Sequence, residues 1–203
     1  MKVELLYHTP DPERAIAAAA RLCYAKEGAS TLMEEMGEDR ENSVLKTILS
    51  REHFSALEHA SFTFAVEGVS RALTHQLVRH RVASYNQQSQ RYVKFSDGLD
   101  VVVPPKVSEK PECEQLFNET TKIIMDAYQK LLAAGIPPED ARYLLPNAAQ
   151  TKIVITMNAR ELLHYFELRC HRTAQWEIRD MSNAMLDLVR PIAPRVFAVL
   201  DAK

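Results

Sequence analysis

The sequence has few cysteines, and their placement argues against two common ways of stapling a small fold. Cys23, Cys113 and Cys170 are odd in number and far apart, and no C-x-x-C pattern occurs in the 203 residues. Neither a disulfide framework nor a structural zinc site is supported by this spacing. Unpaired cysteines fit a reducing compartment, so we expect a cytoplasmic protein.

Long apolar runs are also lacking. The apolar run at residues 15–20 is far shorter than the roughly 20 residues that span a bilayer. It follows Glu4, Asp11 and Glu13 instead of the basic residues that open a signal peptide. We therefore expect no membrane partner.

Several catalytic signatures are missing. No G-x-G-x-x-G, Walker or G-x-S-x-G motif occurs, which disfavours a Rossmann or P-loop nucleotide site and a serine-hydrolase elbow. His75 and His80 are five residues apart and would point about 140° apart on a helix, so we expect no metal site from them. If the chain is an enzyme, a cofactor is expected to carry the difficult chemistry.

What is present predicts an ordinary folded protein. Hydrophobic residues make up 46% and charged residues 26%, which excludes disorder and rods. The apolar spacing predicts an α+β fold with several long helices and a mixed sheet, in a single domain over residues 1–203. The expected strands are 3–7, 59–67, 101–103 and 151–157. The expected helices are 12–21, 30–36, 40–49, 71–79 capped by Ser70, 112–134, 138–145, 159–171 and 175–200, the last kinked at Pro191 or Pro194. Residues 51–58 are expected to form an irregular linker and 82–94 an ordered functional loop.

The charge is uneven along the chain. The net charge is −2, so bulk electrostatics do not favour a polyanion. Yet residues 68–96 contain no acid, although the chain average of 27 acids in 203 residues would place about four there. The basic residues of this stretch are Arg71, Arg79, Arg81, Arg91 and Lys94. A solvated basic surface is one interpretation; arginine forks interleaved with amides and hydroxyls also suit phosphate binding. A second acid-free stretch spans 141–160.

Polar residues on apolar helix faces mark further candidates. Gln76 and His80 fall on the face of Leu73 and Leu77, and Arg169 falls on an apolar face of its own helix. A buried arginine needs a carboxylate, a carbonyl cluster or a ligand. Spacing leaves a structural ion pair and ligand binding equally open. The opposite face carries a polar stripe that is also typical of an exposed surface: Arg160, His164, Glu167 and His171.

One segment is far more specific. Residues 79–92, RHRVASYNQQSQRY, match R-H-R-x-x-S-x-N-x-x-S-x-R-Y at every fixed position. This pattern resembles the signature of the flavin-dependent thymidylate synthases. Further segments resemble the same family in the same order, so the resemblance covers essentially the whole chain: 53–59, 140–146, 158–164, 168–169 and 174–178.

The resemblance implies an activity and an assembly. The family methylates dUMP to dTMP, with methylenetetrahydrofolate as carbon donor and FAD, reduced by NADPH, as hydride source. It is homotetrameric, with active sites where subunits meet, and it does not use a cysteine nucleophile.

The resemblance also implies residue roles. Arg169 is expected to polarise the uracil ring as the catalytic residue. The dUMP contacts it implies are Gln76, Arg79, Gln87, Gln88, Ser89, Gln90, Arg91, Arg142 and Arg169, with Arg142 from another subunit. The FAD contacts it implies are Ser55, Glu58, Arg79, His80, Arg81, Gln87, Asn158, Arg160 and His164, with His53 near the flavin and folate.

Two positions depart from the family pattern. Gln87 stands where many members carry Glu, which changes the charge at that edge of the pocket. Ala56 replaces a frequent Pro after Ser55, which favours a more flexible loop.

Two rival functions use the same residues. A single-strand nucleic-acid module would track phosphates along the basic segment and stack bases on Tyr85, Tyr92 and Phe95, although the negative net charge argues against nucleic acid. A metal-dependent nucleotide hydrolase is weakened by the poor ligand spacing. Bound flavin would distinguish the enzyme from both.

Overall fold

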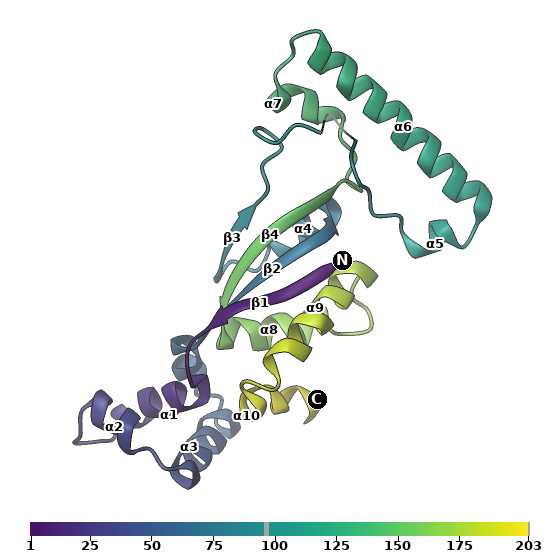
Figure 1. The fold of residues 1–203 in the computed structure, drawn as a ribbon. Coiled ribbons are helices and arrows are strands. Elements are labelled where there is room, and N and C mark those ends of the chain that lie inside the picture. The colour runs from purple at the N-terminus through teal and green to yellow at the C-terminus, as the bar shows by residue number, and fades with distance from the viewer. Residues whose placement is uncertain (96–97, 203) are drawn as a thin grey trace. The chain divides into compact units, whose positions relative to one another are not determined.

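A computed structural model describes residues 1–95 and 98–202 (Figure 1). The strands are β1 (Lys2–His8), β2 (Ser61–Ser70), β3 (Ala83–Gln87) and β4 (Gln150–Asn158). The α-helices are α1 (Pro12–Leu22), α2 (Ala29–Glu35), α3 (Glu38–Ser50), α4 (Arg71–Leu77), α5 (Pro105–Ser108), α6 (Pro111–Ala133), α7 (Pro138–Ala141), α8 (Ala159–Arg169), α9 (Trp176–Val189) and α10 (Pro194–Phe197). Short 3₁₀ helices are η1 (Phe54–His59), η2 (Arg142–Leu144) and η3 (Ala198–Ala202).

The chain divides into two compact units. Unit 1 comprises Met1–Lys2, Val66–Val78 and Asn86–Ile153, and unit 2 comprises Val3–Ala65, Arg79–Tyr85 and Val154–Lys203. All four strands contribute residues to both units. A single domain over residues 1–203 stays a prediction.

The strands form one antiparallel sheet in the order β1-β2-β4-β3. The end of β1 meets the start of β2, where Thr9 N donates to Ser61 O at 2.9 Å. The end of β4 likewise meets the start of β2, where Ala159 N donates to Ala60 O at 2.8 Å. The mixed sheet expected from the sequence was wrong, because strand direction is set by these long-range pairings and leaves no mark in local periodicity.

Several expected elements differ in extent. Part of the expected loop 82–94 is the edge strand β3. Ala83, Tyr85 and Gln87 are half-buried and the residues between them are exposed, so the burial alternates as in a strand although the residues are mostly polar. The expected strand at 101–103 is reduced to one bridge, between Val101 and Ala149.

Two boundaries also moved for reasons of backbone chemistry. β2 continues to Ser70 through Gly68, whose φ of 70° is open to glycine at little cost. The expected helix 175–200 stops at Val189 and resumes as α10, because Pro191 and Pro194 lack the N–H groups that a continuous helix needs. The remaining long helices are confirmed, and the Ser70 cap is confirmed by its bond from Leu73 N at 3.0 Å.

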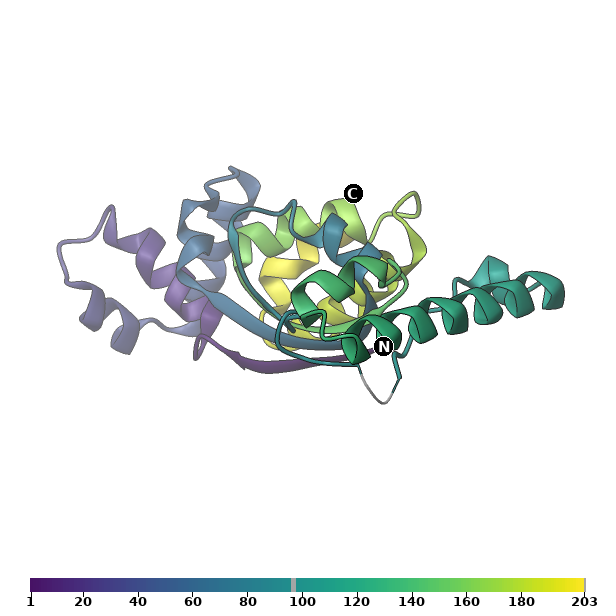
Figure 2. The ribbon, with the colours of Figure 1, turned by 90° about the horizontal axis from the view of Figure 1, so that it is seen from above.

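The core of unit 2 lies between the sheet and the helices that cover one of its faces, α8 and α9 (Figures 1 and 2). β2 and β4 send alternate side chains to this face, including Phe62, Phe64, Ile155 and Met157, all at most 1% exposed. Phe197 of α10 packs edge-on against Phe62 with ring centroids 5.9 Å apart. This packing fixes α8 against the sheet, and α8 carries much of the candidate site.

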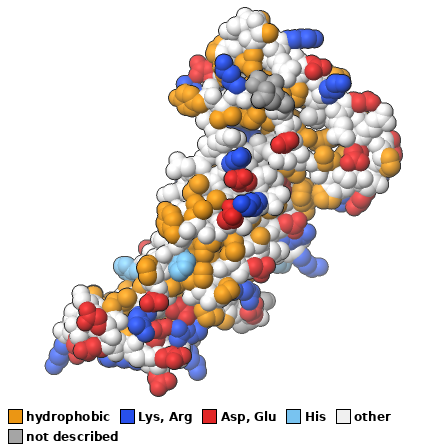
Figure 3. Space-filling model, in the orientation of Figure 1, with side chains coloured by type: hydrophobic (Ala, Val, Ile, Leu, Met, Phe, Trp, Pro, Cys, Tyr) orange, Lys and Arg blue, Asp and Glu red, His pale blue; other side chains and the backbone are white. Residues whose placement is uncertain are grey.

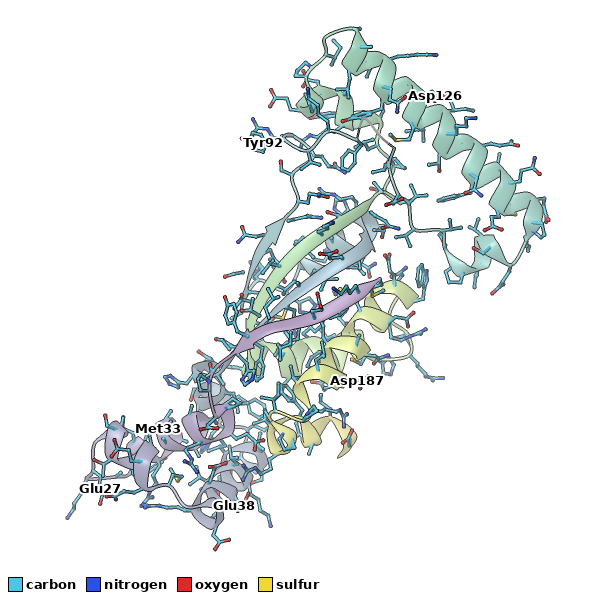
Figure 4. The ribbon with its side chains drawn as sticks, viewed as in Figure 1. Glu27, Met33, Glu38, Tyr92, Asp126 and Asp187 are labelled. Atoms are coloured by element: carbon cyan, nitrogen blue, oxygen red, sulfur yellow. The ribbon has the colours of Figure 1, made fainter. Side chains whose placement is uncertain are left out.

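Unit 1 has its own small core around the end of α6. Met125, Tyr128 and Ala141 are buried there, with partly buried apolar side chains packed on them: Phe95, Leu99, Leu131, Leu132 and Leu145. Asp126, labelled in Figure 4, lies on the exposed side of the same helix turn. The helix α7 and the turn η2 are thereby held against α6, which places Glu139 and Arg142.

An ion cluster joins the N-terminal helices of unit 2 to α10. The carboxylate of Glu13 accepts from Arg195 Nε at 2.5 Å and from the backbone N–H of Arg195 and Val196 at 2.7 and 3.0 Å. The same guanidinium binds Glu41 and Asn42. Glu13 and Glu41 are only 4% and 6% exposed, so Arg195 offsets two buried negative charges.

We therefore expect Arg195→Met to lower the free energy of unfolding by about 3–5 kcal/mol, because it leaves the buried Glu13 without its cation and Glu41 with only Arg14 at 3.5 Å. Urea denaturation measures the change. The matched control is Arg190→Met, which breaks the exposed pair of Arg190 with Asp201 and should cost less than about 1 kcal/mol. Equal losses in the two variants would contradict this account.

Candidate functional site

A buried polar cluster of unit 2 brings together Arg169 and the signature histidine. Arg169 Nε donates to His80 Nε2 at 3.0 Å, and His80 Nδ1 lies 3.3 Å from Glu161 Oε1. His80 and Glu161 are 4% and 9% exposed. The helix α4 ends at Leu77, before His80, so the helical spacing that placed His80 on the face of Leu73 and Leu77 does not apply, although its burial is confirmed.

The contacts of this cluster indicate which ring nitrogen of His80 carries the proton. An imidazole nitrogen that accepts from an arginine N–H carries no proton, so Nδ1–H donates to the Glu161 carboxylate. Burial, and the charges of Arg169 and His164, lower the pKa of His80 to about 4. We therefore treat His80 and Glu161 as a hydrogen bond to a neutral ring, not as an ion pair. Burial also raises the pKa of Glu161.

Two tyrosines contact His80. Tyr165 of α8 meets His80 edge-on with ring centroids 4.8 Å apart. The Tyr85 hydroxyl donates to the backbone carbonyl of His80 at 2.8 Å. Burial raises the pKa of both tyrosine hydroxyls, so they remain neutral donors. The surrounding groups thus favour an uncharged His80.

A cavity of about 640 Å³ lies in unit 2 next to this cluster, with Glu161 in its wall. Its other lining residues are Leu49, Glu52, Phe54, Glu58, Val82, Asn158, Arg160, Leu163, His164, Glu167, Val199 and Leu200. The volume is within the range of small-molecule sites. Four residues expected to contact the flavin therefore share one cavity: Glu58, Asn158, Arg160 and His164. The expected polar stripe is exposed. Its three residues on α8 line this cavity, Arg160, His164 and Glu167, and His171 lies beyond the end of the helix.

Two of these residues already have partners in the chain. Arg160 binds Glu58 at 2.5 Å, with both side chains about half exposed. Asn158 accepts from Glu161 N at 2.8 Å and so caps α8. An exposed ion pair contributes roughly 0–1 kcal/mol, so Arg160 can turn from Glu58 to an anion at small cost.

Other expected flavin residues lie elsewhere. His53, Ser55, Arg79 and Arg81 are exposed and are absent from the lining of this cavity. Ala56 is 8% exposed within η1, so the segment where Pro is frequent is an ordered turn instead of the irregular linker expected for 51–58.

The residues expected to bind dUMP belong to both units. Arg79 and Arg169 belong to unit 2; those of unit 1 are Gln76, Gln87, Gln88, Ser89, Gln90, Arg91 and Arg142. In unit 1, Glu139 gathers two of the arginines: its carboxylate accepts from Arg91 Nε at 3.0 Å, and its backbone carbonyl accepts from Arg142 Nε at 3.0 Å. Burial and the charge of Arg142 lower the pKa of Arg71. In unit 1, Arg142 thus lies near Arg71 and shares Glu139 with Arg91.

One amide of the signature segment is held by hydroxyls of α4 and β4. Gln87 Nε2 donates to the hydroxyls of Thr74 and Thr151 at 3.3 and 3.2 Å. A neutral amide can do this; the glutamate frequent at this position can only accept. Gln88 lines a second cavity, of about 480 Å³, in unit 1, together with Glu67, Asp100 and Lys152. Ser96, the last residue of the acid-free stretch, lies outside the described residues.

The aromatic side chains of this segment differ in exposure. Tyr92, labelled in Figure 4, is 78% exposed, and the guanidinium of Arg91 lies 5.5 Å from its ring centroid. Phe95 packs on the core of unit 1, and Tyr85 is bound to His80. Figure 3 shows acidic and basic side chains interspersed over α1–α3 of unit 2. Of the three aromatic side chains that the nucleic-acid alternative would use, Tyr92 is exposed and Tyr85 and Phe95 are partly buried, so the three do not form one exposed stacking surface.

Two features are absent from residues 1–95 and 98–202. Within these ranges, no group of three or more His, Cys, Asp or Glu side chains is placed to hold a metal ion. Over the same part of the chain, the helices are too short or too polar to cross a membrane.

Sequence reasoning missed Glu161, Tyr85 and Glu139. Glu161 lies within the resembling segment 158–164, to which no role for it was attached, and its partner His80 is 81 residues earlier in the chain. Glu139 lies outside the acid-free stretches, so the search for cationic residues passed over it. Tyr85 was considered only as a stacking side chain.

Three comparisons with known proteins agree. A family model described as "Thymidylate synthase complementing protein" matches residues 4–195. The flavin-dependent thymidylate synthase of Geobacter sulfurreducens is 56% identical over 198 residues, covering 97% of this chain and 85% of that protein. The Clostridium tetani protein of the same name is 45% identical over 213 residues, with 97% and 85% covered. The crystal structure of a UMP/dUMP methylase, PolB from Streptomyces cacaoi, bound with 5-Br dUMP, has a TM-score of 0.84 and 25% identity, covering 99% of this chain and 94% of that one.

The neutral state of His80 makes the fold sensitive to acid. Because its pKa is lowered from 6.5 to about 4 on folding, the unfolded chain takes up the proton first as the pH falls. The stabilisation is complete above pH 6.5 and is lost on the way down to about pH 4, with a size of about 3 kcal/mol. Urea unfolding over this pH range should show a flatter dependence for His80→Gln than for the natural chain. Parallel curves would contradict the prediction.

Proposed function

The chain belongs to the flavin-dependent thymidylate synthase family, and we propose that it methylates dUMP at C5 of the uracil ring to give dTMP. The methylene group comes from methylenetetrahydrofolate, which leaves as tetrahydrofolate. NADPH provides the two electrons that reduce the transferred carbon to a methyl group. The observation that carries the proposal is the signature segment whose His80 holds Arg169, next to a cavity lined by Asn158, Arg160 and His164.

The cavity of unit 2 fits part of a flavin cofactor. Arg160 offers an exposed cation for a phosphate, and His164 offers an exposed imidazole. Leu163, Val199 and Leu200 provide apolar wall against which a ring system can pack. FAD, when bound, supplies the hydride that the protein's own side chains cannot. We assign FAD contacts to Ser55, Glu58, Arg79, His80, Arg81, Gln87, Asn158, Arg160 and His164, with His53 near the flavin and folate.

Arg169 carries the electrostatic part of the mechanism. As C5 of the uracil becomes nucleophilic, negative charge develops on the pyrimidine, and a guanidinium near N3 stabilises it. The bond from Arg169 Nε to His80 fixes the plane of this guanidinium before substrate arrives. A preorganised cation loses little free energy to reorganisation during the reaction, so Arg169 acts on the rate of chemistry.

The other dUMP residues bind and orient the nucleotide. We propose contacts from Gln76, Arg79, Gln87, Gln88, Ser89, Gln90, Arg91 and Arg142. Arginine forks suit the phosphate, and the amides and hydroxyls suit the base and sugar. Holding the base in one orientation lowers the entropic part of the barrier.

The assembly and location are part of the same proposal. We propose a homotetramer in which Arg142 of one subunit reaches the nucleotide bound to another. Like the residues expected to bind dUMP, those assigned to FAD come from both units, which is compatible with sites completed by a neighbouring subunit. The free cysteines are consistent with a cytoplasmic location.

The direct test is to incubate the protein with FAD, NADPH, methylenetetrahydrofolate and dUMP and to measure dTMP by chromatography. We expect dTMP that depends on all four additions. UMP in place of dUMP is the informative control, because the similar PolB is described as acting on both. If dUMP gives no dTMP although FAD is shown to be bound, the proposal is overturned.

Arg169→Ala should reduce the rate of dTMP formation by on the order of 10²–10³-fold, because it removes a preorganised charge donor. Its bound FAD and its oligomeric state should be unchanged. The matched control is Arg172→Ala, an exposed arginine three residues further on, which should retain full activity. A rate near that of the natural chain for Arg169→Ala would remove the role assigned to it.

Arg91→Ala should raise the KM for dUMP by about tenfold, because one charge-assisted contact to the nucleotide is lost. Steady-state kinetics at varied dUMP measures this. Lys94→Ala is the matched control in the same exposed segment and should leave the KM unchanged. If the KM of Arg91→Ala equals that of Lys94→Ala and of the natural chain, Arg91 does not contact the substrate.

A further inference from the structure

We propose that Glu161 and His80 are positioning residues for the proposed reaction, which hold the guanidinium of Arg169 through one specific tautomer of a neutral imidazole. The inference rests on the proposed function, since it is there that Arg169 is assigned to the uracil. It adds Glu161, and it gives His80 a second task beside the flavin contact.

The geometry of α8 makes this arrangement possible. Glu161, Tyr165 and Arg169 are spaced four residues apart, so they follow one another along one face of the helix. Glu161 and Arg169 are two turns apart, a rise of about 12 Å. The His80 ring spans the two, with Nδ1 near Glu161 and Nε2 near Arg169, and it packs edge-on against Tyr165 between them.

Only one protonation state fits these contacts. Arg169 Nε–H donates, so His80 Nε2 must accept, and the ring proton must lie on Nδ1. The other tautomer, or a charged ring, would set N–H against N–H at the Arg169 bond. The carboxylate of Glu161, an acceptor, selects the required tautomer.

The titratable and charged groups next to His80 come from two elements. They are Glu161, His164, Tyr165 and Arg169 on α8, and Tyr85 on β3. Arg169 and His164 disfavour a positive ring, and Glu161 opposes them. A purely structural role would be met equally well by a charged histidine paired with Glu161. That state is incompatible with the bond to Arg169, which points to the arginine as the reason for the arrangement.

The consequence for the reaction is a fixed guanidinium. Arg169 is partly buried, and an arginine side chain loses about 2 kcal/mol of entropy when it is immobilised. The bond at Nε sets the plane of the guanidinium, and so the directions of its terminal nitrogens, before substrate binds. Without that bond, the guanidinium of Arg169 would have to be ordered during the chemical step, and part of this entropy loss would add to its barrier.

Nitrogen-15 NMR of histidine-labelled protein tests the tautomer without any assay of activity. At pH 7 we expect His80 to be protonated on Nδ1 and unprotonated on Nε2. In Glu161→Leu the Nε2–H tautomer should become populated, because the acceptor for Nδ1–H is gone. In Arg169→Ala the acidic titration of His80 should move up from about 4 toward 6.5, since one charge that lowers its pKa is removed. A ring protonated on Nε2 at pH 7 in the natural chain would overturn the proposal.

Kinetics of dTMP formation test the positioning. His80→Phe keeps the ring packing but offers Arg169 no acceptor, so kcat should fall on the order of 10²-fold, with a smaller change in the KM for dUMP. His80→Gln retains an acceptor oxygen and should recover most of that loss. His75→Phe, an exposed histidine on α4, is the matched control and should behave as the natural chain.

The outcomes separate this inference from the proposed function. A folded His80→Phe protein whose kcat lies within about threefold of the natural chain, or equal losses in His80→Gln and His80→Phe, would overturn the positioning role alone. If the natural chain forms no dTMP, the proposed function fails, and the NMR result still decides whether the tautomer is fixed as described. Urea denaturation of each variant confirms that folded protein is compared.

Discussion

The bond from Arg169 to His80 is the interaction on which the rest of the site depends. A cation at the end of α8 is held by a ring that can hold it only while uncharged. That condition explains why a histidine is buried beside a carboxylate without becoming its ion partner. The Asn158 cap fixes the start of α8, the core of unit 2 fixes its inner face, and the signature segment brings the ring to it. Sheet packing, the helix cap and the electrostatics of the site therefore all help to position the guanidinium of Arg169.

The arginines proposed to contact the cofactor and the substrate are held in two different ways. Arg160 and Arg91 are exposed, and each is paired with an exposed carboxylate, Glu58 and Glu139 respectively. Such pairs contribute little to stability, so these arginines can exchange their carboxylate for a phosphate. Arg169 is instead attached to a buried neutral ring. The first arrangement suits ligands that come and go, and the second suits a group that must keep one orientation during catalysis.

Much of the fold could be predicted from the sequence, because helix caps, prolines and apolar periodicity are local signals. Ser70 and the long α6 were predicted correctly on those grounds. The edge strand β3 was missed because its alternating residues are mostly polar. The antiparallel direction was missed because strand pairing is non-local. At the site, the signature segment indicated His80, and the apolar face of its own helix together with the family resemblance indicated Arg169. Glu161 was missed because its contact with His80 joins residues 81 positions apart, which no local pattern reveals.

A crystal structure of the protein with FAD and dUMP tests the central claim most directly. The account predicts a terminal nitrogen of Arg169 within hydrogen-bond distance of the uracil ring, while its Nε remains on His80. Density for the nucleotide away from Arg169, or an Arg169 that leaves His80 when the nucleotide binds, would contradict it.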